Sequence, residues 1–410
     1  MWGSLVISAA FAGDVTVCVD YDTDFVDSTG AGEDYYGTNG TKHARGIRVE
    51  LEGPSAVYFA YADVGAPNPG CATVSVPFGA TYTVRVKSKV QATSNHTVQV
   101  LDGGPGANQG QLFTRTRLQT VSGAPATYEM TLPVADHWNA LAAAGRALTR
   151  NQGGRGSIAL SLYVPDSSGV IDPPSGCSSS QSCVDGTDVW IHDDHVDRKF
   201  RIAHLMGWAF LHDMGYDRPS LVKSADDSHC HVSDRQLTLG NLETTVTGFL
   251  EGYAFWYASS AFNFSNESDC TLVFWEESNW DQLEVCHEEM EADVGHAVSC
   301  ATGPSLAPYE PIVPVTNYRA YCLDERSPGL ASASKPSDTV TPLDVVRFLK
   351  ERVYVDGDLS RNGIGRIFAE AEPDAGDASD FRDALETECG VEGGDSTAWA
   401  TAAGVHGLDQ

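Results

Sequence analysis

The sequence feature that most constrains the fold is a helix-forming segment at residues 196–213 that is apolar on nearly every side. A helix that is hydrophobic all round belongs in the core of a protein, because it has no face to offer to water. A second segment of the same kind, residues 242–262, follows further along the chain. The two segments predict a domain with a pair of buried helices at its centre.

Each predicted helix carries polar side chains that are costly to bury. The first holds His204, Trp208 and His212 on one stripe, because residues four apart share a face of a helix. The second holds Glu251 in the middle of its apolar run. A buried carboxylate needs a hydrogen-bond partner or a proton. The indole N–H of Trp208 is a suitable partner, since a buried tryptophan usually finds an acceptor.

Together the two segments resemble the helix pair of secreted zinc metallopeptidases of the gluzincin type. In that family one helix carries AHExGH and the next carries EGxAxxxA, and this chain has RIAHLMGWAF and LEGYAFWYASSAFN. The layout, with an N-terminal β domain and scattered cysteines, is similar to a group of secreted bacterial proteins of that kind. The resemblance implies a zincin-like fold in which His204 is the first zinc ligand and Glu251 the third.

Two positions depart from the family motif. Leu205 stands where the resemblance places the glutamate that takes a proton from the zinc-bound water. Trp208 stands where it places the second histidine ligand. A catalytic zinc site needs three protein ligands, with water at the fourth position. No catalytic residue is intact, so we expect a degenerate, non-catalytic site without a cofactor and with a binding or structural role.

Three other interpretations remain open on the sequence alone. An active zinc metallohydrolase could regroup its ligands, with His212 as the substitute ligand and further donors at Asp213, His192–His195 and His229–His231. Alternatively, His204 and Glu251 are core residues with no peptidase ancestry. In the third interpretation the chain is a surface or structural protein whose β domain is the functional half.

The strand pattern sets the fold class as α+β. Residues 13–105 contain six short β-branched or aromatic runs with Gly, Pro and Asn between them, which is typical of a β-sandwich. A zincin-like α+β domain is expected at 106–335, followed by a helical subdomain at 336–410.

Cysteine usage favours an exported protein. The ten cysteines are scattered, with no C-x-x-C pair, which indicates disulfides in an oxidising compartment rather than a zinc ribbon. Cys18 and Cys71 fall on two predicted strands and are expected to join them, while Cys177 and Cys183 are expected to close a loop. Residues 1–12 are interpreted as the remnant of a truncated signal peptide. We therefore expect a secreted, periplasmic or cell-surface location.

Charge restricts the classes of partner. The net charge is −30, from 56 acidic against 26 basic residues, which disfavours binding to nucleic acid and to anionic membranes. No apolar run is long enough for a membrane span. The expected partner is an unidentified protein or a surface.

An acidic loop near the N-terminus is a candidate calcium site. Its carboxylates lack the glycine and the terminal glutamate of the helix–loop–helix calcium motif, so a solvated loop is the favoured interpretation. They are Asp20, Asp22, Asp24, Asp27, Glu33 and Asp34.

Three Asn-x-Ser/Thr sequences, at Asn39, Asn95 and Asn266, match the pattern for N-linked glycosylation. They matter only in a cell that glycosylates its exported proteins.

Overall fold

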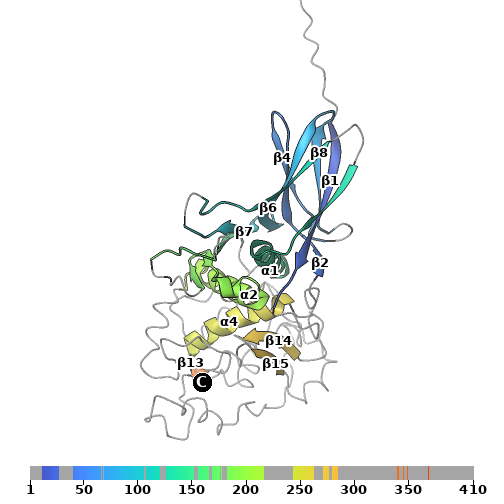
Figure 1. The fold of residues 1–410 in the computed structure, drawn as a ribbon. Coiled ribbons are helices and arrows are strands. Elements are labelled where there is room, and N and C mark those ends of the chain that lie inside the picture. Colours follow the sequence, from blue (N-terminus) through green and yellow to red (C-terminus); the bar gives the residue numbers. More distant parts are fainter. Residues whose placement is uncertain are drawn as a thin grey trace, which may run out of the picture.

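A computed structural model describes residues 12–26, residues 40–216 apart from short gaps, and residues 243–262 (Figure 1). Beyond these it describes only short pieces: 271–276, 279–284, 339–340, Val345, Leu349 and Phe368. The described part is a mixed α+β structure with large sheets and few helices, which confirms the predicted class at that level.

Several expectations fall outside the described residues. They concern the signal-peptide remnant apart from Ala12, the acidic side chains of Asp27, Glu33 and Asp34, the group His229–His231, and nearly all of the predicted subdomain at 336–410.

The first sheet is built around the long strand β1 (Ala12–Thr23). Strands β2 (Gly40–His43) and β5 (Cys71–Pro77) pair with it in antiparallel orientation, and β9 (Ala126–Leu132) pairs with it in parallel. Alternate side chains of β1 are buried, as expected for a strand with one face on a core. The buried set is Val15, Val17, Val19, Tyr21 and Thr23.

The second sheet has eight strands in the order β11-β12-β10-β7-β6-β3-β4, with β8 paired to the first half of β6. Strands β7, β10 and β12 run parallel, and the edge strand β11 runs antiparallel to β12. The bounds are β3 Ile47–Glu52, β4 Val57–Tyr61, β6 Thr81–Thr93, β7 His96–Asp102, β8 Thr114–Thr120, β10 Ile158–Val164, β11 Cys183–Asp185 and β12 Asp188–Trp190.

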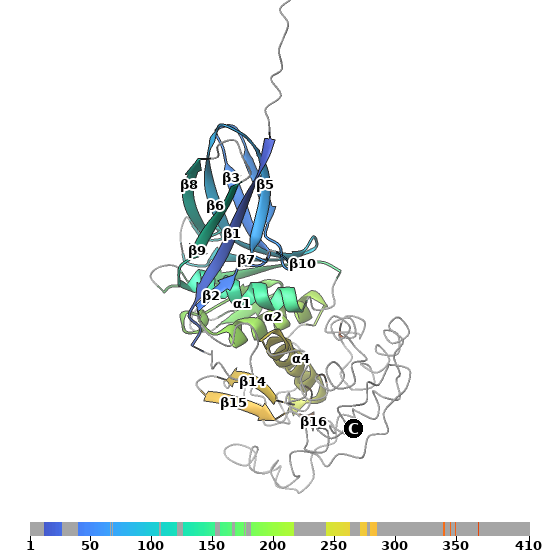
Figure 2. The ribbon, with the colours of Figure 1, turned by 90° about the vertical axis from the view of Figure 1, so that its right-hand side faces the viewer.

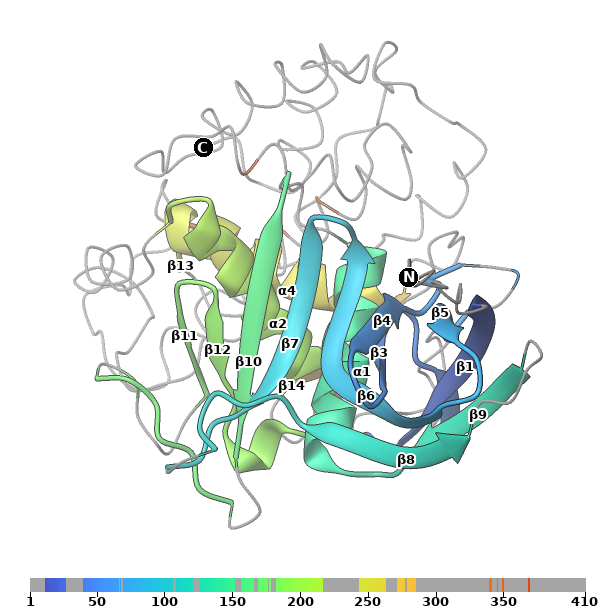
Figure 3. The same cartoon turned by 90° about the horizontal axis from the view of Figure 1, so that it is seen from above.

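Viewed from above, strands of both sheets lie around a ring (Figure 3). Their inward side chains belong to one apolar core that continues into the helices. The predicted domain boundary between residues 105 and 106 falls inside this arrangement. Strands β8, β9 and β10 follow the boundary in the sequence, and they pair with β6, β1 and β7, which precede it.

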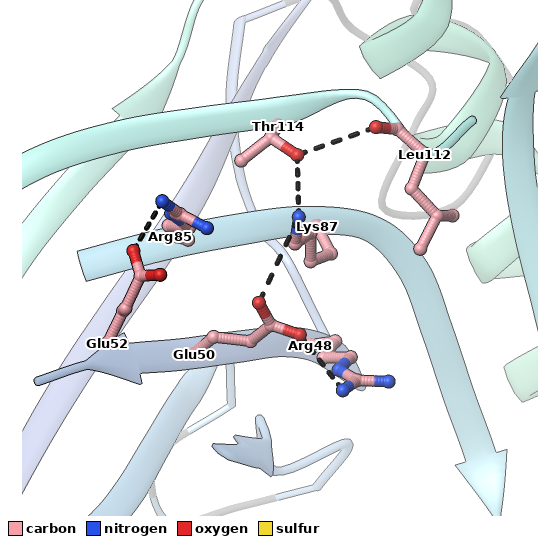
Figure 4. A network of polar contacts seen from close by, with 7 residues as sticks. All are labelled: Arg48, Glu50, Glu52, Arg85, Lys87, Leu112 and Thr114. Atoms are coloured by element: carbon pink, nitrogen blue, oxygen red, sulfur yellow. Dashed lines mark hydrogen bonds and ion pairs between the residues drawn. The ribbon is translucent and has the colours of Figure 1, made fainter. Parts of the chain in front are cut away.

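A polar network ties together strands β3, β6 and β8 (Figure 4). Glu50 forms an ion pair with Arg48 at 2.9 Å and lies 3.9 Å from Lys87 Nζ. Lys87 Nζ also donates to Thr114 Oγ1 at 3.0 Å. Partly exposed ion pairs of this kind contribute roughly 0–1 kcal/mol each. The network therefore favours the strand register more than it adds to overall stability.

Three helices of the described part lie against one end of the sheets (Figure 2). Helix α1 (Asp136–Arg150) packs on β6 and β7, and α2 (Lys199–Asp213) packs between α1 and α4 (Thr245–Phe262). The predicted helix pair is confirmed, although α2 starts three residues later than expected because the short 3-10 helix η1 (Asp193–His195) precedes it. No helix among the described residues combines the length and apolarity that a membrane span requires.

Short strands complete the described part. They form two small two-stranded sheets, and the strand β13 leads directly into α4. The bounds are β13 Glu243–Thr244, β14 Thr271–Glu276, β15 Asn279–Glu284 and β16 Thr339–Val340.

Both predicted disulfides are present. Cys18 on β1 is bonded to Cys71, its register partner on β5, and Cys177 is bonded to Cys183 at the start of β11. The other six cysteines lie outside the described residues. Such bonds persist in oxidising compartments.

Candidate functional site

The candidate site lies where α2 crosses α4. At this crossing the backbones approach so closely that a Cβ atom added to Gly207 would lie 2.8 Å from Ala254 Cα. Glycine is therefore the residue that fits here, and it allows the side chains on either side of the crossing to meet. These side chains are His204 and Trp208 on α2 and Glu251 on α4, which together we name the buried acid cluster.

One carboxylate oxygen is the acceptor of the buried acid cluster. Trp208 Nε1 donates to Glu251 Oε2 at 3.1 Å, and His204 Nε2 lies 3.0 Å from the same oxygen. The indole N–H can only donate, so we assign Oε2 as the acceptor of both contacts and place a proton on His204 Nε2. The predicted contact between Trp208 and Glu251 is confirmed.

The buried acid cluster is removed from water. The exposed fraction is 0% for Glu251, 1% for Trp208 and 4% for His204. The ring of Phe255 lies 4.4 Å from that of His204, and Leu205, the next residue on α2, is also buried. A carboxylate in apolar surroundings is stable only while its donors are in place, so the three residues depend on one another.

The side chains of the buried acid cluster do not fit a zinc ion. Only His204 and Glu251 are of a ligand type, and the third member presents an N–H group, which cannot ligate a metal. Within the described ranges, no three His, Cys, Asp or Glu side chains gather closely enough to hold a metal ion. His212, the expected substitute ligand, is partly exposed, with its ring 6.3 Å from that of Trp208.

His192 and His195, which are also proposed for a regrouped site, belong to a different polar group. Ser182 Oγ lies 2.7 Å from His195 Nδ1 and accepts from the backbone N–H of His192 at 2.8 Å. The backbone N–H of Asp194 lies 3.3 Å from His192 Nδ1. This group links β11 to η1, directly before α2, and sits beside the disulfide at Cys183.

The candidate calcium residues are only partly described. Asp20 forms an ion pair with His43 at 2.8 Å across the β1–β2 pair. Asp24 lies near Asp197, and burial raises the pKa of Asp197, with Asp136 and Asp24 adding to the effect. Burial also raises the pKa of Asp136, with a contribution from Asp193. The sequence gives no signal for this convergence, since its members come from distant segments.

Two partly buried histidines make stability depend on pH. The pKa of His195 is lowered to about 4, mainly by burial and further by the positive charges of Arg201 and Arg198. Burial also lowers the pKa of His137, whose ring stacks on Phe113, to about 4. Both pKa values lie near 6.5 in an unfolded chain. We therefore expect unfolding between about pH 6.5 and 4 to take up close to one proton per histidine, so that stability is lost as the pH falls.

Denaturant titrations at several pH values would measure this proton uptake, and His137→Gln should reduce it by about one proton. The raised pKa values of Asp136 and Asp197 act in the opposite direction, since these groups bind protons in the folded state first. Stability that stays constant from pH 6.5 to 5 would contradict the assignment.

Comparison of the chain with protein-family models and with curated proteins finds no match.

Proposed function

We propose that this chain is an exported protein on a zinc-metallopeptidase-like scaffold, in which the buried acid cluster has replaced the metal site. Its role is then to bind a partner protein or a surface, or to contribute to a structure, rather than to catalyse hydrolysis. The observation that carries the proposal is the pair of contacts to Glu251 Oε2, because the residue at the second-ligand position uses that acid as its hydrogen-bond acceptor.

The arrangement of elements supports the scaffold. A twisted sheet with parallel strands β7, β10 and β12 and an antiparallel edge strand β11 is followed by α2 and then by α4. In the proposed architecture, the strands of both sheets that lie around the ring form the N-terminal part, which resembles a β-sandwich. The zincin-like domain therefore shares the second sheet with these strands.

Export is the proposed location because of the two disulfides. Cys18–Cys71 and Cys177–Cys183 each join residues that lie close in the folded chain, and such bonds are rare in reducing compartments. A net charge of −30 disfavours nucleic acids and anionic membranes as partners.

A second candidate is an active zinc metallohydrolase with regrouped ligands. Its supporting observation is that His212 is partly exposed one turn beyond Trp208 on the same face of α2. This candidate requires Trp208 to move away from Glu251.

Zinc analysis separates the two candidates. We expect the purified native chain to hold no stoichiometric zinc by elemental analysis and to cleave no peptide. Trp208→His should raise the zinc affinity, measured by competition with a chelating dye, because it supplies a third ligand beside His204 and Glu251. Changes in groups that only support a ligand alter metal affinity by about 10–100-fold, so a gain of at least roughly tenfold is expected.

Matched variants identify the origin of the gain. Trp208→Phe removes the indole without adding a ligand and should give no gain, and Glu251→Gln in the Trp208→His background should abolish it. Adding Leu205→Glu supplies a base for water attack. Tightly bound zinc in the native chain would favour the regrouped site. An unchanged zinc affinity in Trp208→His would exclude the proposal that the buried acid cluster has replaced a metal site.

A further inference from the structure

The turn between β6 and β7 presents one asparagine from a rigid support. Asn95 is exposed at the tip of this turn. Its backbone N–H donates to Thr93 Oγ1 at 3.3 Å, and its backbone C=O accepts from the N–H of Ile158, at the start of β10, at 3.0 Å. The next residue, His96, is buried, with Nδ1 2.7 Å from the same Thr93 oxygen. The main chain of the turn is thus fixed, while the Asn95 side chain is exposed.

The side-chain amide of Asn95 is available for modification. Its one contact among the described residues is a long hydrogen bond, 3.4 Å, that Oδ1 accepts from the exposed hydroxyl of Ser94. Within the same residues, Nδ2 has no partner. Thr97 stands two positions later on β7 and is partly exposed, so Asn95-His96-Thr97 has the hydroxyl residue that the glycosylation pattern requires.

We propose that Asn95 is an acceptor for an N-linked oligosaccharide when the chain is exported through a membrane that holds an oligosaccharyl transferase. The donor is an oligosaccharide linked through phosphate to a polyprenol. Asn95 Nδ2 attacks the anomeric carbon, the new N–C bond forms as the bond to the phosphate oxygen breaks, one amide proton is lost to a base, and the polyprenyl phosphate leaves. No oxidation or reduction takes place.

The structure favours this site because an attached sugar displaces no packed side chain among the residues that the structure describes. An exposed asparagine on a hairpin tip can carry a large polar group without disturbing the core, whereas the buried neighbours His96 and Val98 hold the turn on the sheet. The other two candidate asparagines, Asn39 and Asn266, lie outside the described residues. The inference rests on the proposed export of the chain but not on the fate of the buried acid cluster.

Secretion from a eukaryotic cell tests the inference directly. The full chain is expressed behind a host signal peptide, and protein from both the medium and the endoplasmic reticulum is digested with trypsin. The peptide of residues 90–115 contains Asn95 and neither of the other two sequences. We expect this peptide to carry an oligosaccharide, and enzymatic deglycosylation in heavy-oxygen water to convert Asn95 to labelled aspartate.

Three variants complete the test. Asn95→Gln and Thr97→Val should remove the sugar from this peptide, and Thr97→Ser should keep it. Because the host signal enforces entry into the secretory pathway, a failure cannot come from a wrong assignment of export. An unmodified Asn95 in chains with both disulfides formed would overturn the proposal, as would modification that persists in Thr97→Val.

Discussion

Replacing Trp208 with alanine is expected to lower the free energy of unfolding by about 3–5 kcal/mol, the usual cost of removing a large side chain from a core. Trp208 is 1% exposed and fills the space between α2 and α4. The change also removes the N–H group from which Glu251 accepts a hydrogen bond. A buried polar group that loses its partner adds about 1–3 kcal/mol to the loss of stability. Urea denaturation followed by circular dichroism measures the loss.

The variant Trp208→Phe separates the two contributions. Phenylalanine retains most of the apolar volume but has no donor, so its cost relative to the native chain reports mainly the lost hydrogen bond. We expect it to fall between the native chain and Trp208→Ala. A loss below roughly 1 kcal/mol in the alanine variant, the range of surface substitutions, would place Trp208 outside the core.

Substituting Gly207 is expected to push α2 away from α4. In Gly207→Ala the new Cβ would lie 2.8 Å from Ala254 Cα, a backbone atom that cannot move without moving the helix. Overpacking of this kind costs about 1–3 kcal/mol, and the larger Gly207→Val should cost at least as much. The loss occurs although alanine favours a helix interior by about 1 kcal/mol over glycine.

Gly145→Ala on α1 is the matched control. Its new Cβ would lie 3.1 Å from Val90 Cγ2, a side-chain atom, so the contact can relax while the helix propensity is gained. We expect the two variants to differ by about 2 kcal/mol or more in thermal or urea unfolding. Equal stabilities would mean that the helices do not touch at Gly207.

The helix pair and its polar contact could be predicted from local pattern. The apolar surface of residues 196–213 required burial, and the acid in the second helix required a donor, so Trp208 and Glu251 were expected to meet. The two disulfides followed from strand positions and from a short loop. Each feature is indicated by the pattern within single segments, although the partners lie 43 residues apart for Trp208 and Glu251 and 53 for Cys18 and Cys71.

The strand partners could not be predicted in the same way. Alternation of apolar residues identifies β9 as a strand, and the threonines of β8 favour one there, but the pairing of these strands with β1 and β6 depends on contacts between distant segments. The group around Ser182 was missed for the same reason, because its serine lies in a polar loop and its histidines carry no periodic signal. The convergence of Asp24, Asp136 and Asp197 is likewise visible only in three dimensions.

The parallel pairing of β1 with β9 has a consequence for synthesis of the chain. Val15 faces Ala126 in this register, so about 110 residues must be translated after β1 before its partner exists. At ordinary translation rates of roughly 5–20 residues per second, this edge of β1 waits on the order of ten seconds. During that time its backbone N–H and C=O groups can template pairing with another nascent chain. A chaperone that shields the emerging N-terminal segment would therefore help this protein more than one that acts on the finished chain.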